Sequence, residues 1–287
     1  MYYNEVNKRK VALWTRKTAP TPTPIESDVF HFVAGSGGGT VAIPCSTLDY
    51  SLDGKNFQTY TKSKVISLQE NEKVFFRCQN ETQTAVNAQF TLTGTLTPYG
   101  DITTLIAKNG KVTDVTVRGA FANLFANCKL ENIDNLDFSS IVSIHAISAF
   151  EGIFCYANFL SLGDNFLPNL VNAVGDICLY QAFNGAEIKT VGVFLPNLVS
   201  VDGAKGLMQI LSNCTNLISV KSFLPMLSSA NGTNCIYLVL TFSSVKVSTT
   251  HGTTFYTPKV TATRAFWSTN GEEQGDAVAG TTYYWYE

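Results

Sequence analysis

The sequence predicts a mixed, β-rich protein in which an N-terminal antiparallel β-sandwich precedes a solenoid built from 28–29-residue repeats. Three observations lead to this fold class. Apolar pairs recur at a constant interval, a Phe-Leu-Pro segment recurs at nearly the same interval, and the region before both alternates apolar and polar residues. A repeat of this length cannot bury its apolar face alone, so neighbouring units must stack to form a core.

Three landmarks within residues 130–248 define the repeat. They are the pairs Leu130/Ile133, Phe159/Leu162, Ile188/Val191 and Leu217/Val220, the segments starting at Phe166, Phe194 and Phe223, and the single positions Phe154, Phe183, Leu211 and Leu240. Each apolar pair starts 29 residues after the last. The alternative is an ordinary αβ or all-β domain with coincidental spacing, and three landmarks that keep one period argue against it.

Composition bounds the class of protein. The chain has 287 residues, 45% of them hydrophobic, which is enough for a large core. Charged residues make up 15%, against about 25% in an average soluble domain. A net charge of −2 gives no general attraction to nucleic acid or anionic lipid. No run reaches the roughly 18 apolar residues of a membrane span, so we expect no membrane partner.

Seven cysteines are odd in number and thinly spread, and five of them fall one per repeat. A disulfide framework requires a closer, even-numbered set, so we expect free buried thiols that pack as small hydrophobic groups. Free thiols are typical of proteins that fold in a reducing cytosol.

Residues 1–27 form a basic arm with a Pro-rich spacer. The spacer is the Pro20–Pro24 segment, which favours an extended and semi-rigid chain. The arm combines basic and aromatic side chains, and its candidate partner-docking residues are Tyr2, Tyr3, Lys8, Arg9, Lys10, Trp14, Arg16 and Lys17. The alternative is a frayed tail, as many termini are. Five positive charges without a folded platform are a weak indication of nucleic-acid binding, and we do not expect it.

Residues 28–96 alternate with period two, which predicts six or seven short strands arranged as an immunoglobulin-like β-sandwich. Leu48, Tyr50 and Leu52 form one of these alternating runs, and Asp53-Gly54 after them predicts a hairpin turn. The glycine-rich run 35–39 is interpreted as a flexible loop between the first strands.

Residues 97–250 are assigned to the solenoid, with an atypical first repeat near Val115 and Phe121. Residues 251–287 form an aromatic C-terminal segment with eight aromatic residues after position 253. We expect this segment to cap the open end of the solenoid, because an uncapped end exposes a section of the core. A sugar-stacking or partner-binding surface is the alternative.

No constellation for catalysis, cofactor binding or metal binding is evident. The histidines are His31, His145 and His251, and none lies at a metal-ligand spacing from another. His31 lies between Phe30 and Phe32 and is expected to point outward from a strand, whereas His145 is expected to be a packed or surface residue. The glycine-rich run lacks the Lys-Ser/Thr ending of a phosphate loop. The sequence therefore predicts a non-enzymatic protein without cofactor or metal.

The repeat also carries a family resemblance. The unit Leu195-Pro196-Asn197-Leu198 with Val201, followed by Leu211, Cys214, Leu217 and Val220, resembles leucine-rich repeats of the BspA type, and the Tyr50–Tyr60 segment resembles the small β-domain that often precedes them. Such repeats are common in gut Bacteroidales and their bacteriophages. The resemblance implies a leucine-rich-repeat-like solenoid, surface display and adhesion.

Two hypotheses for function follow. The first is a bacteriophage virion structural protein, folded in the host cytoplasm as one of many copies. It would attach to other virion proteins, in the capsid or the tail, through residues 1–24, and present an adhesive body to host-surface glycans or proteins. The second is a bacterial cell-surface adhesin, although no export signal is visible after Lys8–Lys10. A glycan hydrolase is a third class, and it would need two carboxylates about 5–10 Å apart across a groove.

Overall fold

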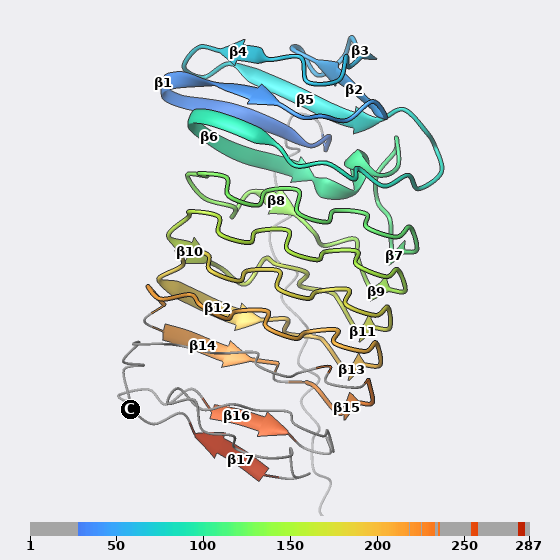
Figure 1. Ribbon diagram of the computed structural model, residues 1–287, viewed down its shortest axis with the longest axis vertical. Helices are drawn as coiled ribbons and strands as arrows, with labels where there is room; N and C mark the ends of the chain where they lie inside the picture. The colour runs from blue at the N-terminus through green and yellow to red at the C-terminus, as the bar shows by residue number, and fades with distance from the viewer. Residues whose placement is uncertain are drawn as a thin grey trace, which may run out of the picture.

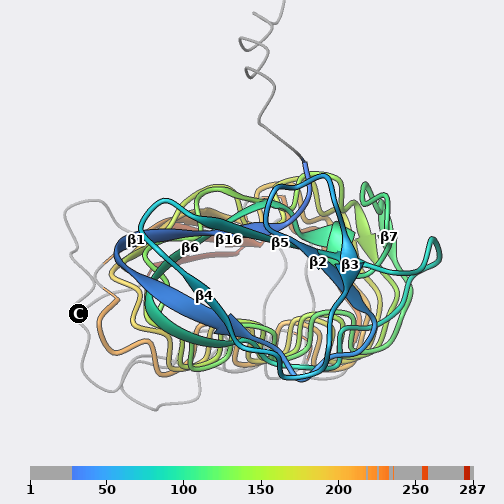
Figure 2. The same cartoon turned by 90° about the horizontal axis from the view of Figure 1, so that it is seen from above.

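The structure of the chain is a computed structural model that describes residues 28–217, 219–224, 226–232, 235, 254–257 and 281–284. It is β-rich, and within these residues the one helical element is the short 3-10 helix η1, Ile102–Leu105. An N-terminal sheet lies at one end of a stack of coils, and the coils form a β-solenoid of about four turns (Figure 1). Seen along the stack, the coils superpose on one another (Figure 2). The predicted solenoid is confirmed.

The N-terminal sheet has seven strands in the order β3-β2-β5-β1-β6-β8, and β4 pairs with β1 off this path. The strands are β1 His31–Ala42, β2 Leu48–Ser51, β3 Gln58–Thr59, β4 Ile66–Leu68, β5 Lys73–Cys78, β6 Thr91–Asp101 and β8 Leu136–Asp137. Strand β1 organises the sheet, because β6 pairs along one edge while β5 and β4 share the other. The strands belong to one hydrogen-bonded sheet, so a two-sheet sandwich stays a prediction.

The sequence suggested that the glycine-rich run 35–39 is a loop, and this was wrong. The run is part of β1. The register between β1 and β6 shifts between Ala34 and Gly39, which marks a bulge. Gly94 of β6 has a φ of 77°, and a Cβ there would lie 2.2 Å from the carbonyl oxygen of Gly38. The glycines let two backbones approach at the bulge, a requirement that the composition of the run alone does not reveal.

The solenoid has two walls of short parallel strands. One wall has the order β15-β13-β11-β9-β7 and the other the order β10-β12-β14. The strands of the first are β7 Asp114–Val115, β9 Ser143–Ile144, β11 Asn172–Ala173, β13 Ser200–Val201 and β15 Ser229–Ala230, and those of the second are β10 Ser161–Leu162, β12 Thr190–Phe194 and β14 Ser219–Phe223. Leu162 pairs with Val191 and Val191 with Val220, so the predicted apolar pairs align in parallel register.

A third side, which we call the turn wall, contains residues 119–127, 148–156, 177–185 and 205–213. Every fourth residue there adopts the left-handed backbone conformation. Asn123, Gln181 and Gln209, for example, have φ near 56°. Peptide N–H groups alternate between a bond to the next coil and a bond back to the third residue before them. The N–H of Asn123 donates to the carbonyl of Glu151 and that of Leu124 to Phe121. The wavy segments of Figure 1 between the two strand walls are this wall.

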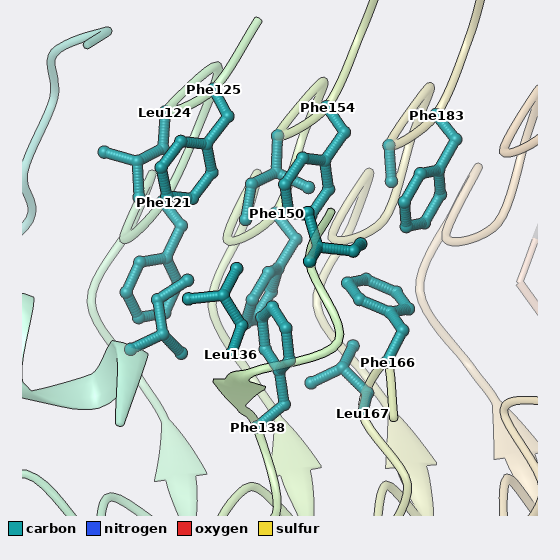
Figure 3. Packing of buried hydrophobic residues seen from close by; sticks show 14 of the residues in the cluster. Phe121, Leu124, Phe125, Leu136, Phe138, Phe150, Phe154, Phe166, Leu167 and Phe183 are labelled. Atoms are coloured by element: carbon teal, nitrogen blue, oxygen red, sulfur yellow. The ribbon is translucent and has the colours of Figure 1, made fainter. Parts of the chain in front are cut away.

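Aromatic columns fill the solenoid. Phe125, Phe154 and Phe183 stack in successive coils, with ring centroids 5.2 and 5.3 Å apart and planes within 13° of parallel. A second column contains Phe138, Phe166 and Phe194. Figure 3 shows Phe125, Phe154 and Phe183 in a row, with Phe138 and Phe166 of the second column facing them. Phe154, Phe183, Phe166 and Phe194 were landmarks of the sequence repeat, so the period reflects coil-to-coil stacking.

The hydrophobic core does not stop where the sheet meets the solenoid. The ring of Phe125, in the first coil, lies 6.0 Å from that of Phe30 and 5.6 Å from that of Phe90. Strand β6 runs across the predicted boundary at residues 96 and 97, and its end pairs in parallel with β8. Buried residues from both regions therefore belong to one cluster.

Near the C-terminus, β16 Thr254–Thr257 and β17 Thr281–Tyr284 pair antiparallel. The other residues of the predicted aromatic cap, including Phe266, Trp267 and Trp285, lie outside the described residues. In the part of the chain that is described, no helix has the length and apolar character needed to cross a bilayer.

Candidate functional site

The predicted docking arm lies outside the described residues, and with it Tyr2, Tyr3, Lys8, Arg9, Lys10, Trp14, Arg16 and Lys17. The chain is described from Asp28, whose carbonyl oxygen accepts a hydrogen bond of 2.8 Å from the N–H of Asp101. The N–H of Phe30 donates to Thr104 Oγ1 at 3.0 Å. The body therefore holds firmly the residues that follow the arm.

Asp101 is the centre of this attachment and is 1% exposed. Its carboxylate accepts hydrogen bonds from the N–H and hydroxyl of Thr103, at 2.9 and 2.7 Å, and from the N–H of Lys111 at 2.8 Å. A carboxylate satisfied in this way fixes the local backbone.

The Lys111 ammonium lies 3.6–3.8 Å from carboxylate oxygens of Asp28, Asp101 and Asp137. Partial burial by itself lowers the pKa of Lys111, but the three carboxylates, Asp101 foremost, raise it above its ordinary value. The amine stays protonated, which excludes it as a nucleophile. The cluster joins Asp28 and the end of β6 to β8.

The two described histidines occupy opposite environments. His31 is 3% exposed and stacks between Phe75 and Tyr99, at 4.6 and 5.4 Å. It lies on the face of β1 opposite Phe30 and Phe32, as expected from strand alternation, but neighbouring rings cover it. His145 lies at the surface, as predicted, with Nδ1 2.7 Å from Asp114 Oδ1.

The His145–Asp114 pair has the geometry of a base and its orienting acid, but a nucleophile is needed to complete such a site. Among the described residues, no hydroxyl or thiol bonds to His145 Nε2. The same residues contain no group of three or more His, Cys, Asp or Glu side chains able to hold a metal ion.

All seven cysteines are free, and six of them are buried while Cys155 is half-buried. Burial raises the pKa of Cys128, Cys178 and Cys214 to about 12. Burial also raises the pKa of Cys155 above its ordinary value. The thiolate is the reactive form, so these cysteines are packing residues rather than nucleophiles.

A cleft of about 610 Å³ opens on the N-terminal sheet, and we call it the head cleft. The β2–β3 turn forms one side, and the segment from β4 into β5 forms the other. Its lining residues are Leu52, Asp53, Gly54, Lys55, Ser67, Leu68, Asn71, Glu72, Lys73 and Phe75. Leu52 continues the alternating run of Leu48 and Tyr50 in the sequence, but it is 60% exposed at the edge of the cleft, whereas Leu48 and Tyr50 are buried. The chain turns away from the strand after Ser51, and Leu52 leaves the core with it.

The acidic side chains of the head cleft, Asp53 and Glu72, accept hydrogen bonds from their own loops. Asp53 accepts hydrogen bonds from the N–H groups of Asn56 and Lys55, at 2.8 and 2.9 Å, and from the Ser51 hydroxyl. The hydrogen bond from the Asn56 N–H has the largest effect, and together with the bonds from Ser51 and Lys55 it lowers the pKa of Asp53 well below its usual range. Glu72 accepts from the N–H of Gln69. The carboxylate of Asp53, held ionised by its own turn, is a poor proton donor.

A second, more open groove of about 820 Å³ lies where the sheet meets the first coil. Gln83 crosses it, donating to the Asp114 carbonyl and accepting from the N–H of Thr116. These bonds tie the 81–84 segment to the start of the solenoid, so we interpret the groove as a structural junction.

Sequence reasoning missed the head cleft and the Lys111 cluster, because both are assembled from segments far apart in the chain. The Asp53-Gly54 turn was the one local indication of the cleft. Comparison of the chain with protein-family models, curated proteins and solved structures gives no match.

Proposed function

We propose that this chain is a non-enzymatic structural protein of a bacteriophage virion, attached to the capsid or the tail. Residues 1–24 would dock it to other virion proteins, and the folded body would face outward as an adhesive surface for host glycans or proteins. Many copies would be present in one assembly. The family resemblance of the repeats and the basic, Pro-linked arm support this proposal.

The observation that carries the proposal furthest is the continuous core. Rings from Phe30 through Phe125 and Phe183 to Phe194 pack without a break from the sheet into the coils. Such a body is stiff, because close-packed interiors resist deformation. A stiff, elongated body can hold a binding surface away from its point of attachment.

The chemistry of the described residues supports a binding role over catalysis. The buried thiols are protonated, the Lys111 amine is paired, and Asp53 and Glu72 of the head cleft serve their own turns. We further propose that the coils are leucine-rich repeats of the BspA type and that the N-terminal sheet is a compact form of the small sandwich domain. The Leu-Pro-Asn-Leu segments support the first assignment and the alternating strands the second.

The test is incorporation into particles. The full chain and a variant lacking residues 1–24 are each produced during phage infection, and purified particles are analysed by mass spectrometry. We expect the full chain in the particles and at least a tenfold loss of the shortened one, with unchanged circular dichroism. Undiminished incorporation would remove the arm from the proposal. Recovery of the full chain with the outer membrane instead of particles would favour the bacterial adhesin.

A further inference from the structure

The turn wall carries two tyrosines on neighbouring coils. Hydrogen bonds between coils fix their positions: the N–H of Tyr156 donates to the Asn184 carbonyl, and the N–H of Gly152 to the Tyr180 carbonyl. Tyr156 therefore lies beside Gly185, and Tyr180 lies beside Glu151. Both residues belong to the turn wall and not to the strand walls.

Tyr156 is held in place although it is 57% exposed. Its ring lies against Gly185, where an added Cβ would be 2.4 Å from both Cδ1 and Cε1. A glycine at this position leaves room for one flank of the ring, and the remainder of the ring is open to solvent. An exposed aromatic ring that is already positioned loses little conformational freedom when a flat ligand stacks on it.

Tyr180 is half-buried. Burial raises the pKa of Tyr180, and the charges of Glu151 and Cys155 raise it further. The hydrogen bonds between coils set Tyr180 level with Gly152 and Tyr156 level with Asn184, so the two tyrosines lie on adjoining coils about one turn-wall repeat of four residues apart. The Tyr180 hydroxyl stays protonated at neutral pH and can donate a hydrogen bond.

Two amide pairs border the tyrosines. Gln181 Nε2 donates to Gln209 Oε1 at 2.7 Å, and Asn213 Nδ2 donates to Asn184 Oδ1 at 2.9 Å. Each pair uses one acceptor and one donor hydrogen, which leaves amide groups such as Gln181 Oε1 with capacity for a ligand. Amides on the same wall as the exposed Tyr156 ring supply both kinds of contact that a sugar requires, since its hydroxyls bond to amides and its C–H face packs on an aromatic ring.

We propose that Tyr156, Tyr180 and the adjoining amide pairs form a saccharide-binding platform for uncharged oligosaccharides. This inference rests on the proposed adhesive function and names its ligand class. Glu151 beside Tyr180 places a negative charge on the platform, which disfavours sialylated or sulfated chains through like-charge repulsion. Gluco-configured β-1,4-linked chains serve as the neutral probes, because their equatorial hydroxyls leave flat C–H faces for stacking.

Titration calorimetry and ligand-observed NMR with cellohexaose and chitohexaose test the platform on the full chain. We expect wild type to bind at least one of them, and Tyr156→Ala to weaken binding about tenfold, the effect of losing one stacking interaction. Tyr156→Phe keeps the ring and should bind like wild type. Leu160→Ala, which removes an exposed apolar residue outside the turn wall, should also leave the affinity unchanged.

A head-cleft variant, Leu52→Ala, separates the two candidate surfaces. If Leu52→Ala abolishes binding while Tyr156→Ala with Tyr180→Ala does not, the platform is wrong, and the adhesive function stands with the cleft as its site. Wild-type binding of hyaluronan hexasaccharide in preference to both neutral probes would overturn the ligand class, and so would the absence of binding to either. Incorporation into particles is measured separately, so a failed platform is distinguishable from a failed proposed function.

Discussion

The rings of Phe125 and Phe154 stack 5.2 Å apart at an angle of 9°, although 29 residues separate them in the chain. Each is fully buried, and Phe183 continues the stack by another coil. The stack joins successive coils through the interior, whereas the backbone hydrogen bonds join them at the walls. The stability of the solenoid should therefore depend on each ring in the column.

Phe154→Ala should lower the free energy of unfolding by about 3–5 kcal/mol, the usual cost of truncating a fully buried phenylalanine. The lost ring contacts Phe125, Phe159 and Phe183, so the cavity cannot close by movement of one side chain. Urea denaturation followed by circular dichroism measures the change. Leu160→Ala, at a position 60% exposed, is the control and should cost less than about 0.5 kcal/mol. Equal effects at the two positions would contradict the stacked core.

Gly94→Ala should destabilise the N-terminal sheet by more than about 2 kcal/mol. It combines a positive φ with a Cβ placed 2.2 Å from the Gly38 carbonyl oxygen, so the strands must separate. Gly37→Ala is the matched control, because its φ is 84° but an added Cβ meets nothing within 4 Å. We expect about 1 kcal/mol there from backbone strain alone. Thermal unfolding of the two variants should preserve this order, and the reverse order would contradict the bulge.

Stability should fall as the pH drops below about 6.5. Burial lowers the pKa of His31 below its ordinary value of 6.5. The hydrogen bond between its Nδ1 and the Val29 carbonyl raises the pKa but does not offset burial, and the charge of Lys73 lowers the pKa further. The unfolded chain then binds the proton more readily than the folded one, so protonation favours unfolding. The free energy of unfolding should fall by up to about 1.4 kcal/mol per pH unit between pH 6.5 and the pKa of His31 in the folded protein.

Urea denaturation of wild type and His31→Phe between pH 8 and pH 5 measures this term. The variant keeps an aromatic ring between Phe75 and Tyr99 but cannot titrate. Its unfolding free energy should therefore depend less on pH in this range. An identical pH dependence in both proteins would show that His31 is not held neutral.

Native thiol labelling should be selective for one cysteine in seven. Cys155 is half-buried, whereas the other six are buried and three of them have pKa values raised to about 12. A maleimide at neutral pH should modify Cys155 first and the others after unfolding, as peptide mapping would show. Cys155→Ser should abolish the early product. Rapid modification of Cys178 or Cys214 in the folded protein would contradict the packed coils.

The repeat was predictable because the same positions contact each other in every coil. The Phe-Leu-Pro landmarks place Phe166 and Phe194 in one column, and the apolar pairs place Leu162 beside Val191. Interior stacking imposes one residue type per column, and that constraint is visible as a period. The left-handed positions of the turn wall carry no such constraint on type, since Asn123, Gly152 and Gln181 are equivalent there.

The candidate surfaces were not predictable for a related reason. Leu52 appeared to continue a strand until the turn at Asp53 carried it away from the core. Tyr156 and Tyr180 lie on the same wall because their coils are adjacent, and their separation in the chain does not match the repeat. Close approach of β6 to the glycine run likewise depends on pairing across more than 50 residues.

Parallel register between coils is the central claim, and an engineered disulfide tests it most directly. Asn172 of β11 pairs with Ser200 of β13, and Ser200 Oγ lies 3.0 Å from Asn172 Oδ1. Asn172→Cys with Ser200→Cys should form a disulfide without loss of structure, because neighbouring strands hold the Cα atoms within bridging distance. Asn172→Cys with Ser229→Cys, two coils apart, should not. Peptide mapping that finds the bridge in the second pair, or in neither, would contradict the stacked solenoid.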